Sequence, residues 1–586
     1  MVLPRSSSAV ARPFVVACIL AVAALAPLAR GQASKPTAKN SKRAIADYMA
    51  SCEALGWSGV VLVRKQGKTV YFEAHGLADR ENGRLLKKDT RFEIASLSKP
   101  LTAAAVMSLV DEGKVDLEAS IADYLPGVPE HAKEITVSQL LSHESGMPRT
   151  ADRGHGDDLR DAVAGYLAEP PIHEPGTREQ YWNGGYALLA GIVETVDNRS
   201  FEDSLRERVF GPAKMKSSGF VGEKIPEHEQ ARGYEEGRAS RLASEPPYGS
   251  TGWQYRGMGG IVTHAEDLLS FLDALDDGDI VEAKTAKLMQ TRASANFGLG
   301  WGLAYSKELG TRRGHGGDVR GFHVYLTSLV DEKIDVIVLS NFGPMETYKV
   351  TWNLEALALG QKLPYEAPPK GVAWKASDFK ALEGTWTSEE GSTLEVNSTA
   401  AGLTVIRSSS GELESDPHVA LMNKLIASLQ AKDLEAVRAS VTEQHPYWPD
   451  QLVKSIWPAH LAKHDELVEF SPFAVLDTGR GFVDVRFTFQ HEKEEVLGYA
   501  TIKDGRVGTL VLDQTDDVFA ASKGYTNRGA PSTAPTWWMP VKDDQLVRFD
   551  WAKGAVAGRM QLDAKPRKAT TISLNGETFR KATSKK

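Results

Sequence analysis

A proline close to the start of one apolar segment fixes where a helix begins. The segment RFEIASLSKPLTAAAVMSLVDEG contains Pro100 directly after Lys99. Proline is tolerated only in the first turn of a helix, where the backbone N–H groups have no intrahelical partner. We therefore expect a helix over residues 100–113, with Ser96 at or near its N-terminus.

Ser96 and Lys99 form a Ser-x-x-Lys pair at this helix start. Residues three apart on a helix lie on one face, so the hydroxyl and the amine should be close. The helix dipole favours negative charge at this end, which helps a serine oxygen to become a nucleophile. Alone the pair is a weak signal, because an N-capping serine followed by an exposed lysine gives the same pattern.

Two further motifs strengthen this interpretation. Tyr181-Trp182-Asn183 stands directly before a second apolar segment, and His315-Gly316-Gly317 precedes a strand-like run. With these motifs, and with ITVSQLLSHESGMP and GMGGIVTHAEDLLSFL, the sequence resembles the penicillin-recognising serine hydrolases, in the group related to class C β-lactamases. That group includes D-amino-acid peptidases and esterases, and the resemblance covers about residues 43–360.

The resemblance implies a role for each motif residue. Ser96 would be the acylated nucleophile, Lys99 its proton partner, and Tyr181 the general base or the relay to the leaving group. Which of Lys99 and Tyr181 is the primary base stays open. The substrate-binding and oxyanion-hole positions implied by the family are Asn183, His315 and Gly317 for the substrate, and the backbone N–H groups of Ser96 and Asp318 for the oxyanion.

The sequence departs from the family pattern at two positions. Trp182 is bulkier than the usual small residue, so we expect it to narrow the cleft. His315 replaces a lysine that helps to hold a substrate carboxylate, which favours neutral esters or amides over β-lactams. With an ordinary pKa near 6.5, His315 would gain a proton between about pH 8 and 6 and improve cephalosporin hydrolysis relative to ester hydrolysis. Arg313 and Arg320 are the next candidates for binding a carboxylate.

The resemblance implies an α+β, β-lactamase/transpeptidase-like fold over residues 43–362, with an antiparallel sheet flanked by helices and an all-helical region. Strand-rich runs at both ends of this range agree with it: two surround the turn QGK, and VYLTSLV is followed by KIDVIVLSNF. The Pro-rich stretch 363–374 marks a domain boundary.

The remaining sequence contains two kinds of secondary-structure pattern. Residues 375–411 and 541–584 contain short strand-like runs, and residues 412–522 place helical patterns before four strand-like runs. We expect the two outer segments to form one small β-barrel-like domain, similar to the lipocalin-like domain often appended to this family. The inserted α+β module resembles the NTF2-like fold, for which a spacer or interaction role is expected.

The N-terminus has the features of an export signal. Arg5 and Arg12 precede the apolar run 13–29, and small residues follow. We expect residues 1–31 to be a signal peptide and 32–42 a polar linker, with the protein exported to the periplasm or outside the cell. A membrane would be a partner only if the signal is not cleaved.

Charge and motifs exclude several classes of partner. A net charge of −8 with a pI of about 6.0 is unlike the basic excess of nucleic-acid-binding proteins. No cofactor motif is found, and His155 with Asp157 and Asp158 lacks a third ligand, so a solvated loop is expected there and no metal.

The leading hypothesis is an exported serine hydrolase that cleaves an ester or amide, possibly a D-amino-acid peptide, through an acyl-enzyme on Ser96. The alternative is a non-catalytic receptor that binds cell-wall-like peptides in the same cleft.

Overall fold

The computed structural model divides the chain into two compact units, Met1–Pro368 and Pro369–Lys586. It describes residues 38–54, 56–148, 158–235, 238–247, 252–342, 347–365, 367–372, 374–399, 402–408, 416–442, 448–477, 483–492, 495–512, 532–533, 536–550, 555–574 and 576–581. The expected signal peptide at 1–31 and the loop containing His155 and Asp157 lie outside the described residues. No helix in the described part of the chain is long and apolar enough to cross a membrane.

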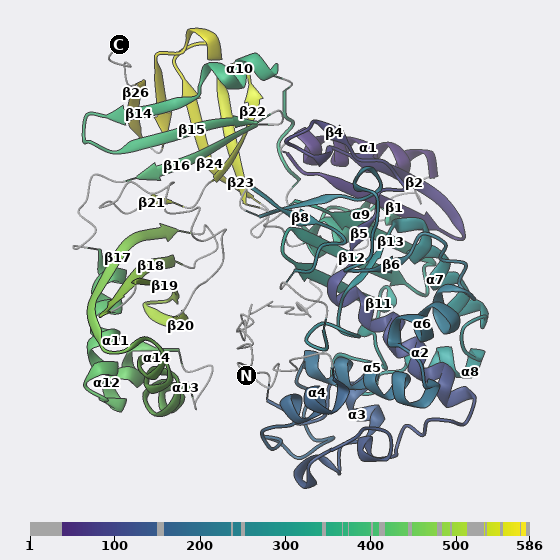
Figure 1. Ribbon diagram of the computed structural model, residues 1–586. Coiled ribbons are helices and arrows are strands. Elements are labelled where there is room, and N and C mark those ends of the chain that lie inside the picture. The colour runs from purple at the N-terminus through teal and green to yellow at the C-terminus, as the bar shows by residue number, and fades with distance from the viewer. Residues whose placement is uncertain are drawn as a thin grey trace. The chain divides into compact units, whose positions relative to one another are not determined.

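The first unit is built on a six-stranded antiparallel sheet in the order β10-β11-β12-β13-β1-β2 (Figure 1). Its strands are β1 (Gly59–Lys65), β2 (Lys68–His75), β10 (Gly302–Ser306), β11 (Gly310–Val319), β12 (Phe322–Leu329) and β13 (Ile334–Ser340). Gln66 and Gly67 both have positive φ, as a two-residue hairpin turn between β1 and β2 requires. Strands from both ends of the unit therefore meet in one sheet.

Helices cover both faces of this sheet. The longer helices of the unit are α1 (Ala38–Ala54), α2 (Lys99–Asp111), α4 (Leu159–Tyr166), α5 (Asn183–Asp197), α7 (Ala265–Asp277), α8 (Ala283–Met289) and α9 (Thr347–Leu359), and the short ones are α3 (Val137–Leu141) and α6 (Phe201–Leu205). Neighbouring side chains on a strand point to opposite faces. On β11, Arg313 bonds Asp276 of α7 and Arg312 bonds Glu355 of α9, which assigns the two helices to opposite faces.

Small elements connect the sheet to the helical region. They are the strands β3 (Leu77–Asp79), β4 (Arg84–Leu85), β5 (Phe92–Glu93), β6 (Gly219–Phe220), β7 (Arg232–Glu235), β8 (Arg238–Leu242) and β9 (Ile261–Thr263), and the short helices η1 (Ala95–Ser98), η2 (Ile121–Asp123), η3 (Glu130–Ala132), η4 (Arg206–Phe210) and η5 (Glu227–Glu229). Strands β5, β9 and β6 form one three-stranded sheet. The chain leaves β5 and enters η1 and α2 directly, so this sheet determines where α2 begins.

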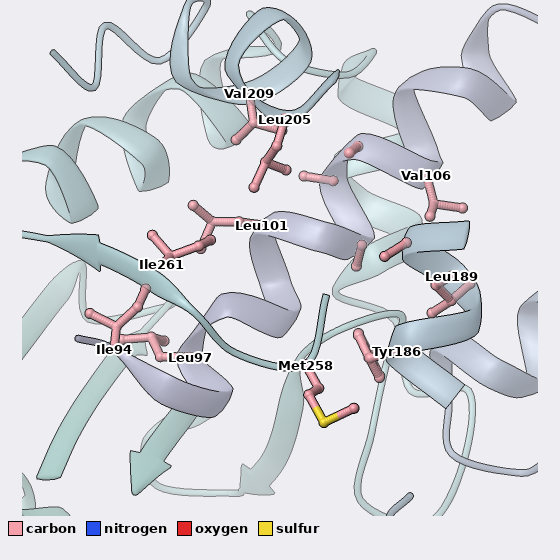
Figure 2. Packing of buried hydrophobic residues seen from close by; sticks show 14 of the residues in the cluster. Ile94, Leu97, Leu101, Val106, Tyr186, Leu189, Leu205, Val209, Met258 and Ile261 are labelled. Carbon is pink, nitrogen blue, oxygen red and sulfur yellow. The ribbon is translucent and has the colours of Figure 1, made fainter. Parts of the chain in front are cut away.

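Helix α2 is buried along nearly all of its length, from Lys99 to Leu109. Figure 2 shows Leu101 and Val106 of α2 among apolar side chains from α5, α6 and β9, including Leu189, Leu205 and Ile261. A helix that is apolar all round is a core helix, and each fully buried leucine contributes about 1.5–3 kcal/mol. The start of α2 is therefore held in a rigid environment.

In the second unit, eight strands close an antiparallel barrel in the order β15-β14-β26-β25-β24-β23-β22-β16, with β16 pairing back to β15. The strands are β14 (Gly384–Ser388), β15 (Thr393–Thr399), β16 (Gly402–Ser408), β22 (Thr536–Lys542), β23 (Gln545–Asp550), β24 (Ala555–Leu562), β25 (Thr571–Leu574) and β26 (Glu577–Lys581), accompanied by α10 (Ala376–Ala381) and η8 (Pro566–Lys568). Trp386, Leu546 and Phe579 lie in its core.

A separate α+β module is inserted between β16 and β22. It consists of α11 (Pro417–Gln430), α12 (Leu434–Ser440), α13 (Trp448–Gln451), η7 (Leu452–Ile456) and α14 (Trp457–His464), followed by the antiparallel strands β17 (Leu467–Asp477), β18 (Val483–His491), β19 (Glu495–Lys503) and β20 (Arg506–Val511). The two-residue strand β21 (Ser532–Thr533) joins β16 to β17. Helices before strands, with a core of their own, are the order that the sequence predicts. The NTF2-like assignment stays a prediction.

The α+β class and the interrupted barrel are confirmed, whereas two element boundaries differ from the prediction. The polar segment 32–42 was expected to be a linker, but α1 begins at Ala38 and buries Ser41, whose hydroxyl bonds the carbonyl of Ala358 in α9. Tertiary packing therefore extends the helix into a polar sequence. In the barrel, β22 begins at Thr536, before the predicted residue 541, because its first residues pair with β16.

Candidate active site

Ser96 lies in the single turn η1 immediately before α2, at the end of the buried helix. The preceding residue, Ala95, has φ of +46°, a left-handed conformation that is costly for a residue with a Cβ. Strain of this kind, about 1–3 kcal/mol, persists where the surrounding structure imposes it, and it is common at functional sites. Here the hydrogen bond from the Ile94 N–H to the carbonyl of Ile261 ties the residue before Ala95 to strand β9, which lies outside the turn.

Lys99 is completely buried, and its amine lies among oxygen atoms from separate segments of the chain. Its Nζ donates to Ser96 Oγ at 3.0 Å, to Asn183 Oδ1 at 2.9 Å and to the carbonyl of Met258 at 3.0 Å. The structure thus brings Ser96, Lys99 and Asn183, which are distant in the sequence, into one hydrogen-bonded cluster. An amine in hydrogen-bond contact with a serine oxygen is placed for proton transfer to or from that oxygen.

Tyr181 and Asn183 flank the start of α5. Asn183 is the first residue of the helix, and Trp182 is its N-cap with extended backbone angles. The side chain of Trp182 is 2% exposed, and its ring packs edge-on against Tyr166 in the helical core. The expectation that Trp182 narrows the cleft is therefore wrong, because its bulk fills the core.

The ring of Tyr181 lies within a group of aromatic and cationic side chains. Its centroid is 4.3 Å from that of His143, 6.0 Å from that of Phe297 and 6.3 Å from that of His315. The Nζ of Lys99 is 5.0 Å from the same centroid. Tyr181 is thus next to both the amine and the third motif.

The third motif runs along β11 beside η1. A Cβ at Gly317 would overlap the carbonyl oxygen of Ile94, two residues before Ser96, so only glycine lets the strand approach this closely. Asp318 is the next residue on β11, and its carboxylate bonds Nδ1 of His323 on β12 at 2.5 Å. The close passage of β11 past η1 brings the backbone near Asp318 to the nucleophile.

His315 is 4% exposed, and burial together with the neighbouring Lys99 cation lowers its pKa to about 3. Its Nδ1 is 2.7 Å from the carbonyl of Gly316, which opposes the shift without cancelling it. His315 is therefore neutral at pH 8 and at pH 6. The expectation that it gains a proton in this range is wrong, because the prediction assumed the pKa of an exposed imidazole.

Arg313 is not placed to bind a substrate carboxylate. It is 2% exposed and makes a bidentate pair with Asp276, at 2.6 and 2.8 Å. Its guanidinium also lies 5.2 Å from the ring centroid of Trp301. These contacts tie β11 to α7, so Arg313 has a structural role.

Three contacts of the site were not predicted from the sequence. The contact with the Met258 carbonyl uses a backbone group, which any residue at this position could supply. The sequence feature that could have indicated it is the pair Gly257 and Gly260, whose positive φ values shape the loop. Phe297 follows from no motif. His143, which lies in the segment ITVSQLLSHESGMP, packs directly on Tyr181.

Comparison with known proteins identifies the family. A family model described as beta-lactamase matches residues 42–360, over half of the 586-residue chain. The chain belongs to the beta-lactamase family. As a member, it has a β-lactamase/transpeptidase-like fold in its first unit and is a serine hydrolase of this type, as the sequence predicts.

Relatives of this beta-lactamase family member include two kinds of named protein. Penicillin-binding protein 4 of Amycolatopsis lactamdurans is 28% identical over 347 residues, which cover 54% of this chain and 90% of that protein. The D-aminopeptidase of Brucella anthropi is 31% identical over 324 residues, 52% of this chain and 60% of that protein. The crystal structure of a penicillin binding protein from Bacillus halodurans is 25% identical, covers 53% of this chain and 98% of that one, and has a TM-score of 0.47.

Proposed function

We propose that the protein is an exported hydrolase that cleaves a neutral ester or amide, of the D-amino-acid peptide class, through an acyl-enzyme on Ser96. The observation that carries the proposal is the buried Lys99 amine, in contact with both Ser96 Oγ and Asn183 Oδ1. The D-aminopeptidase among the relatives supports an amide substrate.

In the proposed reaction, Ser96 Oγ attacks the substrate carbonyl carbon while its proton passes to Lys99 in its neutral amine form, or to Tyr181 in its phenolate form. The oxyanion of the tetrahedral intermediate accepts hydrogen bonds from the backbone N–H groups of Ser96 and Asp318. Collapse breaks the bond to the amine or alcohol, which leaves with the proton. Water then attacks the acyl-Ser96 ester, the same groups return a proton to Oγ, and the acid product departs.

The substrate is proposed to be neutral near the third motif because His315 is neutral there. A protonated lysine at that position would add a charge-assisted hydrogen bond to a carboxylate, about 1.5–3 kcal/mol for such a contact. Without this cation, kcat/KM for an anionic β-lactam is expected to be roughly 10- to 150-fold lower. Asn183 is proposed to bind the substrate amide, and Gly317 to leave room for it along β11.

Covalent labelling tests the nucleophile. The full-length protein is treated with a fluorophosphonate, and the labelled peptide is identified by mass spectrometry. We expect the label on Ser96, loss of labelling in Ser96→Ala, and a fall in turnover of about 10³-fold or more. Lys99→Arg should also lose turnover, because a guanidinium does not deprotonate at working pH. A label on another serine overturns the proposal.

A substrate panel tests the class and the alternative function. We expect D-amino-acid amides and neutral esters to be turned over faster than a cephalosporin at pH 8, with a ratio unchanged at pH 6. Binding of penicillin or cell-wall peptides without turnover would favour the non-catalytic receptor instead. N-terminal sequencing of the protein recovered from outside the cytoplasm tests export and cleavage near residue 31.

A further inference from the structure

His143 bonds the backbone on both sides of Tyr181. Its carbonyl accepts the N–H of Gln180 at 2.7 Å, and its side-chain Nδ1 accepts the N–H of Trp182 at 3.2 Å. Residues 180–182 precede α5 and belong to no helix or strand, so regular secondary structure does not hold Tyr181 in place. A single residue thus satisfies the backbone donors before and after the tyrosine.

The hydrogen bond from the Trp182 N–H to Nδ1 determines the tautomer of the His143 imidazole. Nδ1 accepts a hydrogen bond only when it carries no proton, so the proton of the neutral ring is on Nε2. The side chain is 2% exposed, and its backbone has φ of +62°, a left-handed conformation uncommon outside glycine, asparagine and aspartate. The ring is therefore directed at residues 180–182 by a strained backbone conformation at His143.

The same ring also packs against the side chain that it helps to hold. The centroids of His143 and Tyr181 are 4.3 Å apart with an interplanar angle of 34°. Phe297 contacts both rings, and Tyr186, whose hydroxyl donates to the carbonyl of Leu141 at 2.9 Å, lies on another side of His143. Backbone and ring of Tyr181 are thus both positioned by His143.

We propose that His143 is a positioning residue for the hydrolysis, which holds Tyr181 beside Lys99 and Ser96 by accepting the Trp182 N–H on Nδ1 and packing on the tyrosine ring. This inference rests on the proposed function, in which Tyr181 moves a proton. His143 acts through Tyr181 and does not touch the reacting atoms. A displacement of about 1 Å in such a group is enough to lower a rate about 10²-fold.

Three substitutions separate the acceptor from the rest of the side chain. Asparagine places an amide oxygen close to the position of Nδ1 and tolerates positive φ, so His143→Asn should keep the bond to Trp182. His143→Gln places its amide one bond further out, and His143→Gly keeps the backbone conformation without an acceptor. We expect kcat to fall about 10²-fold in His143→Gln and His143→Gly, with little change in KM, and to fall less in His143→Asn, which keeps the hydrogen-bond acceptor but not the aromatic ring.

A double-mutant cycle with Tyr181→Phe tests whether His143 acts through the tyrosine. Groups that act as one unit have non-additive effects. We therefore expect His143→Gly to cause no further loss of kcat in the Tyr181→Phe background, with circular dichroism and thermal unfolding showing that each variant is folded. Additive losses, or full activity in a folded His143→Gly, would overturn the inference. Failure of the proposed function is distinguished by the fluorophosphonate label, which would then map away from Ser96 in the unmodified protein.

Discussion

At the scale of single residues, the burial of His315 beside Lys99 links the acid stability of the protein to one imidazole. Its pKa is about 3 in the folded state and about 6.5 when unfolded, so between these values the unfolded state binds the extra proton. The contribution of His315 to the free energy of unfolding is therefore fully present above pH 6.5. It is lost as the pH falls toward 3, at up to about 1.4 kcal/mol per pH unit.

His315→Gln removes this titration while keeping a neutral polar side chain. We expect its denaturation midpoint to fall less steeply than that of the unmodified protein between pH 6 and 4, measured by tryptophan fluorescence in urea. Other titrating groups contribute equally to both curves. Parallel curves would mean that the imidazole of His315 takes up its proton in the folded state at an ordinary pH.

Gly317 is required by a close approach between chain segments. A Cβ there would overlap the Ile94 carbonyl, which is backbone and cannot move aside cheaply, whereas a Cβ at Gly316 would meet the side chain of Tyr325 at 2.9 Å. Gly317→Ala should therefore push β11 away from η1 and lose most activity, and Gly316→Ala is the matched control with a smaller loss. Comparable kcat/KM in two folded variants would show that this spacing does not matter for turnover.

The sequence motifs predict which of these residues matter, but not their environment. Ser96, Lys99 and Asn183 follow from motif and spacing, and the helix start follows from Pro100. The low pKa of His315 and the buried position of Trp182 do not follow, because both depend on side chains brought in from distant segments. Patterns along the chain carry no information about such neighbours until the fold is known.

At the scale of elements, an ion pair on β5 connects the strand before Ser96 to the loop that contacts Lys99. Glu93 is fully buried and bonds both Arg241 of β8 and the hydroxyl of Tyr255. Burial raises the pKa of Glu93, and the Arg241 cation opposes that shift. Tyr255 precedes Met258, whose carbonyl accepts a hydrogen bond from Lys99. The buried Glu93 therefore helps to hold both the strand before Ser96 and the loop that contacts Lys99.

Glu93→Ala should destabilise the protein by about 3–5 kcal/mol, because it leaves the buried Arg241 without its carboxylate. The matched control is Glu229→Ala, which breaks the partly exposed pair with Arg91 and should cost at most about 1 kcal/mol. Urea unfolding of both variants measures the two costs. Similar values for the two would indicate that burial does not distinguish the pairs.

Sequence patterns predict the elements better where local signals are strong. The β1–β2 hairpin and the strands β12 and β13 follow from alternating apolar residues and turn sequences. The start of α1 at Ala38 does not, because its first turn is polar and is stabilised by α9, over 300 residues away in the sequence.

At the scale of the whole molecule, the division at Pro368 predicts that the first unit folds and acts alone. All motif residues lie in Met1–Pro368, and so do all the hydrogen bonds described for Lys99. The fragment should contain residues 38–368, since a start at 43 would remove Ser41 from α1, and Tyr365 bonds Asn353 of α9. A domain with its own core is expected to fold without its neighbours.

We expect the 38–368 fragment to unfold cooperatively, to be labelled by a fluorophosphonate on Ser96, and to hydrolyse a small activated ester at a rate similar to that of the full chain. The same fragment carrying Ser96→Ala is the control for background hydrolysis. A small ester is the right probe because it needs little beyond the nucleophile and the oxyanion hole. A folded but inactive fragment would mean that the barrel or the inserted module supplies part of the catalytic site, because the first unit would then contain every motif and still lack turnover.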